Sequence, residues 1–271
     1  MKEIKILLVL SFLVFTAQLF AQDLTIGGKE KTQKNSTDSV VKNKVMIIPF
    51  EERMYFSEFD KEISEADNLS FQQIRDKFRN GVDTALYLNF LPICNVLSML
   101  RKGSEYENDI DLIYAGIGYS YEVLPVDESS TQTKVQNRNS TKKIQSVNEK
   151  GKISKGQLLD NQDNQEKFMA TTITNENLLN YLNKKYDVEY FVFVNQLDVK
   201  RKSGTTVYEI QDNEYIKEVR IHYTILDYQG KRLAAGISSS EVPSKDRSFY
   251  SYFQKGIKPG TSQIAKIFSL E

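Results

Sequence analysis

Two unbroken apolar runs constrain the fold of this chain more than any other feature. One run covers residues 45–48 and is closed by Pro49, and the other covers residues 190–194. Strands whose apolar residues do not alternate with polar ones are typically covered on both faces, as in parallel or mixed sheets. The sequence therefore predicts an α/β (α+β) domain in which a mixed β-sheet is flanked by helices.

Helical and extended patterns surround these two runs. Ser70 and Gln73 have the spacing of a capping box, which predicts the start of an amphipathic helix that Pro92 ends. Ser57 and Asp60 have the same spacing and predict a shorter helix. In chain order we expect a strand at 45–48, helices from 57 and at 71–89, a strand at 93–100, a helix at 105–117, an extended segment at 119–124, a helix at 175–186, strands at 190–199, 219–225 and 233–242, and a helical region at 249–270.

The second half of the chain predicts an antiparallel hairpin. Arg220, His222 and Thr224 alternate with apolar residues, which is typical of a strand covered on one face only. Residues 227–230 supply the turn to the next strand. In the final helical region, Gly256 and the Pro259-Gly260 pair should break or kink the helix.

Two segments lack any apolar period. Residues 22–43 predict a flexible tether, and residues 126–166 predict a disordered polar insertion, because neither can bury enough surface to offset the entropy of ordering it. A small hairpin near residues 152–159 is an open alternative within the insertion. Residues 44–271 otherwise predict a single domain, since neither block flanking the insertion contains a complete sheet.

The first 21 residues predict export. Lys2 and Lys5 precede an apolar run at residues 6–15, and Ala21 offers a small residue for cleavage of a signal peptide. An uncleaved membrane anchor is the alternative, but it needs roughly 20 apolar residues and Gln18 interrupts the run. We expect a protein of the periplasm, the outer-membrane surface or the extracellular space, without a transmembrane segment after signal removal.

Charge and cysteine content limit the partners and the means of stabilisation. The chain has 36 basic and 36 acidic side chains, so no excess of positive charge favours nucleic acid, and we expect no nucleic-acid partner. Cys94 is the only cysteine, which excludes an intramolecular disulfide. Its apolar neighbours predict a small buried side chain within a strand.

The sequence offers few catalytic or metal-binding combinations. His222 is the only histidine, so this chain alone cannot form a serine triad or a two-histidine zinc motif, and we expect a structural role. Carboxylate pairs could bind calcium or act as acid and base, but none has the spacing of a calcium loop. The pairs are Glu51-Glu52, Asp109-Asp111 and Asp160-Asp163. Phosphate and dinucleotide motifs are missing too, so we assign no catalytic or metal residue and expect no cofactor.

A dense aromatic group near the carboxyl end is the candidate interaction surface. It consists of Phe249, Tyr250, Tyr252 and Phe253. Packing of a helix against the sheet is the simpler interpretation. Contact with a partner is the alternative, because aromatic rings are efficient interface anchors.

Three segments resemble one architecture of envelope proteins. Residues 45–50 resemble the opening strand of the amino-terminal domain of the Tol-Pal translocation protein, of the lipoprotein activators of penicillin-binding proteins and of the curli-secretion lipoprotein. Residues 186–193 resemble their helix-to-strand passage, and residues 226–231 their hairpin turn. The Ile-Pro-Phe strand, followed by Met54-Tyr55 and Ser57-Glu58, also resembles a family of exported proteins of unknown function.

The resemblance implies a fold and a location and carries over no binding residue. The chain lacks the lipid-attachment cysteine of those proteins, and Val194-Asn195 stand where a glycine often ends the buried strand. The function that we expect is a non-catalytic exported binding or assembly module of the bacterial cell envelope. Its sheet edge or aromatic helix would hold an envelope protein or a glycan. The alternatives are a carboxylate-dependent glycan hydrolase and a structural subunit of a secreted or outer-membrane complex.

Overall fold

The computed structural model describes residues 43–101, 106–124, 153–154, 157–158 and 166–268. The signal peptide expected at 1–21, almost all of the tether at 22–43 and most of the insertion at 126–166 lie outside these residues. The strands are β1 (Lys44–Ile48), β2 (Tyr55–Ser57), β3 (Asn95–Ser98), β4 (Ile117–Val123), β5 (Ile153–Ser154), β6 (Gln157–Leu158), β7 (Lys167–Ile173), β8 (Tyr190–Arg201), β9 (Ile216–Asp227) and β10 (Arg232–Pro243). The helices are α2 (Asp60–Asp67), α3 (Phe71–Phe90), α4 (Glu107–Ala115), α5 (Leu178–Tyr186), α6 (Val207–Gln211), α7 (Phe249–Tyr252) and α8 (Lys258–Phe268), with a 3-10 turn at Glu52–Met54 and a π-helical turn at Phe253–Ile257.

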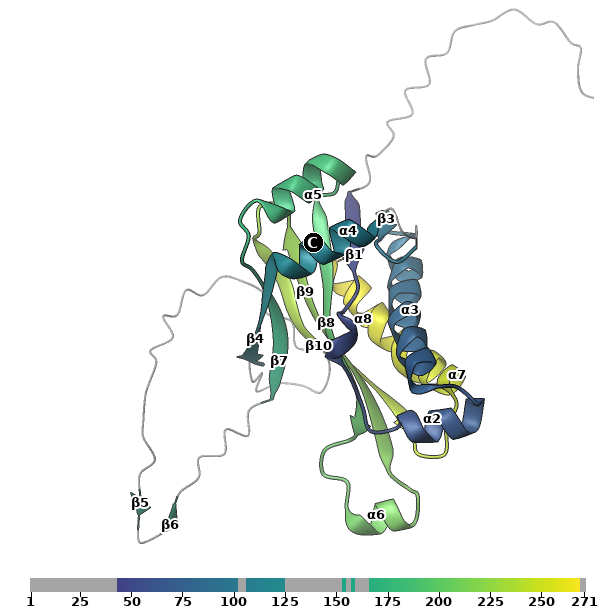
Figure 1. The fold of residues 1–271 in the computed structure, drawn as a ribbon. Helices are drawn as coiled ribbons and strands as arrows, with labels where there is room; N and C mark the ends of the chain where they lie inside the picture. Colours follow the sequence, from purple (N-terminus) through teal and green to yellow (C-terminus); the bar gives the residue numbers. More distant parts are fainter. Residues whose placement is uncertain (1–42, 102–105, 125–152, 155–156, 159–165, 269–271) are drawn as a thin grey trace, which may run out of the picture. The chain divides into compact units, whose positions relative to one another are not determined.

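The two apolar runs are neighbours at the centre of a six-stranded sheet. The strand order is β10-β9-β8-β1-β3, and β1 is parallel to both β3 and β8. The long hairpin strands β9 and β10 are antiparallel, and β2 extends the sheet by pairing with the far end of β8. The prediction of a mixed sheet flanked by helices in a single domain is therefore confirmed (Figure 1).

The helices α2, α3, α7 and α8 cover one face of this sheet. The capping box predicted at Ser70 and Gln73 starts α3, whose buried side pairs with α8 and with the strands below (Figure 1). We call this side the helix face. Its core is formed by apolar side chains of alternate strand positions and of α2, α3, α7 and α8, among them Val45, Ile47, Phe78, Val82, Leu86, Val192, Val194, Val219, Ile221, Tyr252 and Ile264.

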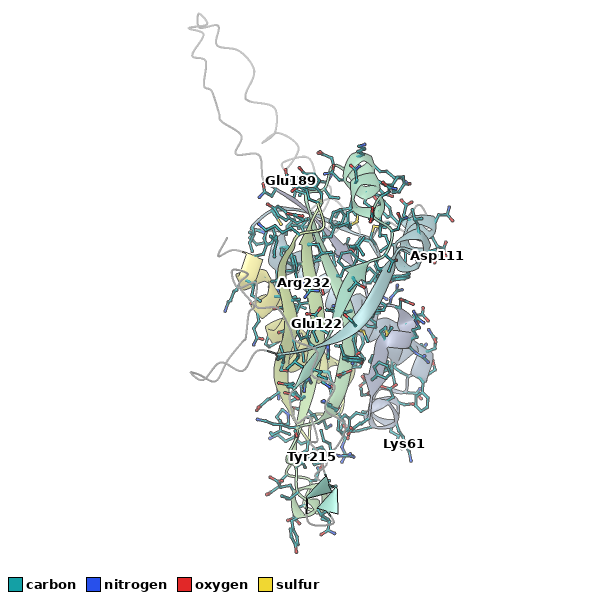
Figure 2. All side chains as sticks on the ribbon, turned by 90° about the vertical axis from the view of Figure 1, so that its left-hand side faces the viewer. Lys61, Asp111, Glu122, Glu189, Tyr215 and Arg232 are labelled. Atoms are coloured by element: carbon teal, nitrogen blue, oxygen red, sulfur yellow. The ribbon has the colours of Figure 1, made fainter. Side chains whose placement is uncertain are left out.

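The opposite face carries α4, α5 and a second, two-stranded sheet. In that second sheet β4 and β7 pair antiparallel over their whole length, from Ile117↔Ile173 to Val123↔Lys167. We call β4 and β7 the ribbon, and the sheet surface beneath it the ribbon face. Figure 2 looks at this side, where Arg232 of β10 lies beside Glu122 of β4.

Several expectations need correction. The polar alternation at 219–225 predicted an open face, yet Arg220, His222 and Thr224 are buried beneath β7. Ser57 belongs to β2 and makes no capping box: the N-cap of α2 is Phe59, without a side-chain cap. Cys94 is buried but lies just before β3.

Besides β2, two further elements were not predicted, and two finer expectations are confirmed. The structure contains β7, immediately after the polar insertion, and α6, in the connection between β8 and β9. The alternative hairpin is present as the short β5–β6 pair, with Ile153 opposite Leu158. The final helical region is interrupted at Gly256 as expected, because Phe253–Ile257 winds as a π-helical turn between α7 and α8, whereas Pro259 and Gly260 lie in the first turn of α8 and do not break it.

Candidate functional site

The four residues of the predicted aromatic surface divide into different roles. Tyr252 is fully buried and contacts the rings of Phe59 and Phe78, so it belongs to the core. Tyr250 is 69% exposed. Phe249 and Phe253 are partly buried, and their ring centroids lie 6.2 Å apart. Tyr252 therefore fits the packing interpretation, and Tyr250, Phe249 and Phe253 stay the candidate interaction surface.

Local structure fixes the position of the two phenylalanines. The side chain of Ser248 caps α7, and the backbone N–H of Phe249 donates to Asp67 Oδ2 at 2.7 Å. The Phe249 ring then packs edge-on against Phe78 of α3, with centroids 5.2 Å apart. Phe253 begins the π-helical turn, and such turns are often found at functional sites.

Phe249 and Phe253 form one wall of a groove of about 480 Å³, and α3 forms the other. We call this the aromatic groove. Gly81 lies in the wall contributed by α3, where a Cβ atom would lie only 3.3 Å from Phe249 Cζ and 3.4 Å from Phe253 Cδ2. Around these apolar groups the lining is polar and includes Gln73, Asp76, Lys77, Asn80 and Thr84. The Lys77 ammonium lies 5.4 Å from the centre of the Phe249 ring, within range of a cation–π contact.

A second hollow lies beyond the carboxyl ends of β1 and β3. Open sheets usually bind ligands where successive connections leave in opposite directions, here between β1 and β8, but β2 fills that position. The hollow, about 640 Å³, lies instead between the ends of β1 and β3 and α4, and we call it the carboxyl-edge cleft. Arg79 is held there by bonds to Phe50 O (2.9 Å) and Tyr114 Oη (3.0 Å). Burial raises the pKa of Tyr114.

The carboxylate pairs are only partly gathered in this cleft. Glu51, Glu52 and Asp111 line it together with Glu107, but Glu51 is paired with Arg53 at 2.7 Å. Asp109 points elsewhere: it is 5% exposed and accepts from Lys185 Nζ at 2.7 Å. Asp160 and Asp163 lie outside the described residues.

Asp83 of α3 is a buried carboxyl group that the sequence did not single out. It is 3% exposed, and the Ser98 hydroxyl lies 2.8 and 2.7 Å from its two oxygens. Burial raises the pKa of Asp83 to about 6, although Ser98 and the nearby Arg101 and Arg79 oppose the shift. A perturbed carboxyl group close to a cleft is a recognised feature of functional sites, but Asp83 does not line the cleft itself.

His222 and its neighbours form a buried polar network on the ribbon face. His222 Nε2 lies 3.2 Å from Asp198 Oδ2, and its Nδ1 accepts the backbone N–H of Met169 at 2.9 Å. Burial alone would raise the pKa of Asp198, but the hydrogen bonds from His222 and Gln196 outweigh it and lower the value. Within the part of the chain that the structure describes, no group of three or more histidine, cysteine, aspartate or glutamate side chains is placed to hold a metal ion.

Comparison with known proteins adds no relative to this description. Neither the protein-family models, nor the curated proteins, nor the solved structures yielded a match for the chain. In the residues that the structure describes, no helix combines the length and apolar character that a membrane crossing requires.

A third surface was not anticipated from the sequence. The connection between β8 and β9 carries α6, which Figure 1 shows at the end of this long hairpin. Val207 and Tyr208 are 67% and 78% exposed there, and Ile210 is 41% exposed. A capping box between Thr206 and Glu209 starts the helix. That capping box, which encloses Val207 and Tyr208, was the sequence signal that could have found the helix.

Proposed function

We propose that this protein is a non-catalytic binding module of the bacterial cell envelope, and that the aromatic groove holds an apolar side chain of a partner envelope protein. The observation that carries the proposal is the pairing of Phe249 and Phe253 against Gly81 of α3. The centres of protein interfaces typically contain aromatic anchors and are surrounded by a polar rim. The aromatic groove has this composition, with Gly81 as the small residue in its opposite wall.

The context of this site also supports the proposal. The signal-like first 21 residues and the resemblance of residues 45–50 to envelope proteins favour export to the periplasm, the outer-membrane surface or the medium. Asp76 and Lys77 place opposite charges on the rim. A peptide with an apolar residue between polar ones matches this lining, whereas a purely apolar lipid tail would leave the rim unpaired.

Site-specific crosslinking in the native cells tests the groove directly. Three exposed tyrosines, each replaced singly by a photoreactive phenylalanine analogue, sample different surfaces: Tyr250 beside the groove, Tyr208 on α6, and Tyr228 at the β9–β10 turn. We expect Tyr250 alone to give one discrete protein adduct. Equal adducts at all three positions, or none at Tyr250, would contradict the proposal.

A matched pair of substitutions separates binding from folding. Phe253→Ser removes a groove wall, and we expect it to weaken the Tyr250 crosslink about tenfold or more, in line with the loss of an interface anchor. Phe56→Ser is the control, because Phe56 is 51% exposed but lies outside the groove. If both variants keep the crosslink, the groove is not the binding surface. An adduct on a glycan in place of a protein would select the other predicted partner class.

The carboxyl-edge cleft supports a second candidate, the carboxylate-dependent glycan hydrolase. Glu52, Glu107 and Asp111 line one cleft of about 640 Å³ and could supply acid and base groups. A screen of envelope glycans with the wild type and with a combined Glu52→Gln and Asp111→Asn variant distinguishes this function. Turnover by the wild type that the double variant loses would favour it, and turnover that persists would exclude these two residues.

A further inference from the structure

The ribbon is attached to the main sheet by an unusual row of hydrogen bonds. The backbone of β7 pairs with β4 on one side, and on the other side it bonds to side chains of β8 and β9. Asn195 Nδ2 donates to Met169 O at 2.7 Å, His222 Nδ1 accepts from Met169 N, and Thr224 Oγ1 accepts from Thr171 N at 3.0 Å. Three side chains thus replace the backbone ladder that a further strand would normally provide.

A bulge in β8 makes this row possible. The register between β8 and β9 shifts between Val194 and Gln196, so Asn195 is the extra residue. A bulge redirects side chains, and here both Asn195 and Gln196 serve the ribbon face. Asn195 accepts from the Thr171 hydroxyl at 2.5 Å, and Gln196 accepts from the Tyr121 hydroxyl at 2.8 Å.

The bonds of His222 fix its protonation state. Nδ1 accepts the Met169 N–H, so it carries no proton, and Nε2 is left to donate to Asp198. The attached ribbon therefore requires a neutral imidazole. A second proton would have to enter at Nδ1, where it would face the N–H of Met169 and break the bond.

We propose that His222 is an acid-sensitive latch for the ribbon: its protonation releases Met169 and loosens the attachment of β7 to the main sheet. Release gives the imidazolium a free N–H at Nδ1 while Nε2 keeps the Asp198 carboxylate as a charged partner. The loosened state consequently binds the proton more tightly than the attached state. Acid must then shift the population toward it, because a ligand favours the state for which it has higher affinity.

The surroundings of His222 decide how strongly this latch responds. On its own strand, Arg220 is paired with Glu166 and lies 3.6 Å from Glu218, so its positive charge is offset. The remaining charged or titratable groups on the elements packed around the network are Lys217, Tyr223 and Asp227 of β9, Tyr190, Asp198, Lys200 and Arg201 of β8, Lys167 of β7, Tyr119, Tyr121 and Glu122 of β4, and Arg232 and Glu241 of β10. Glu122 is held by Arg232 in a bidentate pair, with bonds of 2.6 and 2.8 Å. Asp198 is thus the group in direct contact that favours the imidazolium.

The latch lies near the ends of β4 and β7 that flank the polar insertion in the sequence. Residues 125–165 join the end of β4 to the start of β7, and the backbone N–H of Leu124 donates to Glu166 O at 2.8 Å. Phe168 and Ala170 remain packed with Leu124, Ala235 and Ile237. We therefore expect acid to loosen the ribbon around Met169 without unfolding the domain.

The single histidine of the chain allows a direct test by nitrogen NMR of the full-length protein. Its ring nitrogens can be observed without competing signals. At about pH 7.5 we expect an unprotonated Nδ1 and a protonated Nε2, and we expect acid to add a proton at Nδ1. A proton on Nδ1 at the higher pH would overturn the proposal.

Amide hydrogen exchange then measures the release itself. After correction for intrinsic exchange, we expect the protection of the Met169 amide to fall about tenfold or more from about pH 7.5 to about pH 5. The amide of Ile221, within the main sheet, should keep its protection. Parallel loss at both amides would mean global unfolding and would overturn the latch.

Two variants distinguish a titrating latch from a merely structural bond. His222→Asn places an amide oxygen near the position of Nδ1 and cannot titrate in this range, so Met169 should stay protected at both pH values. Asp198→Asn keeps the histidine but removes its charged partner, and the loss of protection should move to lower pH. A response of the His222→Asn protein equal to that of the wild type would refute the proposal. If that variant fails to fold, an unshifted response in Asp198→Asn would do so.

Discussion

The two faces of the main sheet are covered by different means. On the helix face, α3 and α8 satisfy their own backbone hydrogen bonds, so the strands beneath them present mainly apolar side chains. On the ribbon face, β7 has one edge without a strand partner among the described residues, and the sheet meets it with Asn195, His222 and Thr224. The comparison shows that the covering element determines whether buried strand positions are apolar or polar.

The faces should therefore respond differently to the same core truncation, and this is the largest effect that we expect. Phe78 on the helix face and Phe168 under the ribbon are both fully buried. Phe78 contacts three other rings, so Phe78→Ala should lower the free energy of unfolding by about 3–5 kcal/mol. Phe168→Ala should cost less and act mainly on the ribbon.

Denaturant unfolding measures the first difference, and hydrogen exchange in β7 measures the second. Wild-type exchange in β9 is the reference for the Phe168→Ala protein. If the two substitutions destabilise the domain equally and lower protection everywhere, the ribbon belongs to the same cooperative unit as the helix face. The two faces would then differ in structure but not in stability.

Asn195→Ala should have the next largest effect, because it removes a side chain with three buried bonds. Met169 O, the Thr171 hydroxyl and the Thr224 hydroxyl would each lose a partner. Unsatisfied buried polar groups cost about 1–3 kcal/mol each, so we expect a loss of about 2–4 kcal/mol after partial relaxation. Thr224→Val removes a single hydroxyl and is the graded control. Equal losses from the two variants, measured by denaturant unfolding, would argue against a network centred on Asn195.

More of the helix face than of the ribbon face could be predicted from the sequence. Ser70, Gln73 and the three- and four-residue apolar spacing of α3 define an element by local signals. The unbroken run at 45–48 indicated that both faces of β1 are covered. Such patterns are read from the positions of apolar residues. Strands covered by helices keep apolar residues at their buried positions, so the patterns can be seen in the sequence.

The ribbon could not be predicted by the same argument. Arg220, His222 and Thr224 alternate as a solvent-exposed face would, because a strand edge and water both require polar partners. The two strands of the ribbon are separated by residues 124–166, so no turn signal joins them. At the candidate site, the sequence identified Phe249 and Phe253 but not Gly81, since a glycine inside a helix reveals nothing about the rings that pack on it.

Asp83 is a buried carboxyl group on the helix face, and its removal should stabilise the protein. Burial raises its pKa from 3.8 to about 6, so the folded state holds a proton that the unfolded state releases. The stability linked to Asp83 is full below about pH 3.8 and is lost as the pH rises through about 6. Asp83→Asn retains an oxygen for the Ser98 hydroxyl and should gain about 1–3 kcal/mol at neutral pH.

Unfolding curves for Asp83→Asn and the wild type across about pH 4–8 provide the measurement. The gain should shrink toward about pH 4, where the wild-type carboxyl is protonated in the folded state. Ser98→Ala is a useful companion, because it removes the hydroxyl bond that stabilises the carboxylate and should raise the pKa of Asp83 further. A gain that is independent of pH would show that burial of the charge is not the cause.

Gly81→Ala should have the smallest effect on stability and a clear effect on the groove. Replacing glycine by alanine inside a helix favours folding by about 1 kcal/mol, while the new methyl group would press on Phe249, Phe253 and Ile257 at 3.3–3.4 Å. These contributions oppose each other, so the free energy of unfolding should change by less than about 1 kcal/mol. The methyl group nevertheless occupies the wall that faces the aromatic rings, and the crosslink from Tyr250 to a partner should weaken.

Gly256→Ala is the matched contrast, because its Cβ would lie 2.5 Å from Val219 Cγ2, inside the core and away from the groove lining. It should destabilise the domain more than Gly81→Ala and leave the crosslink of the folded fraction unchanged. The reverse pattern would mean that the rings at Gly81 serve only to pack the helices.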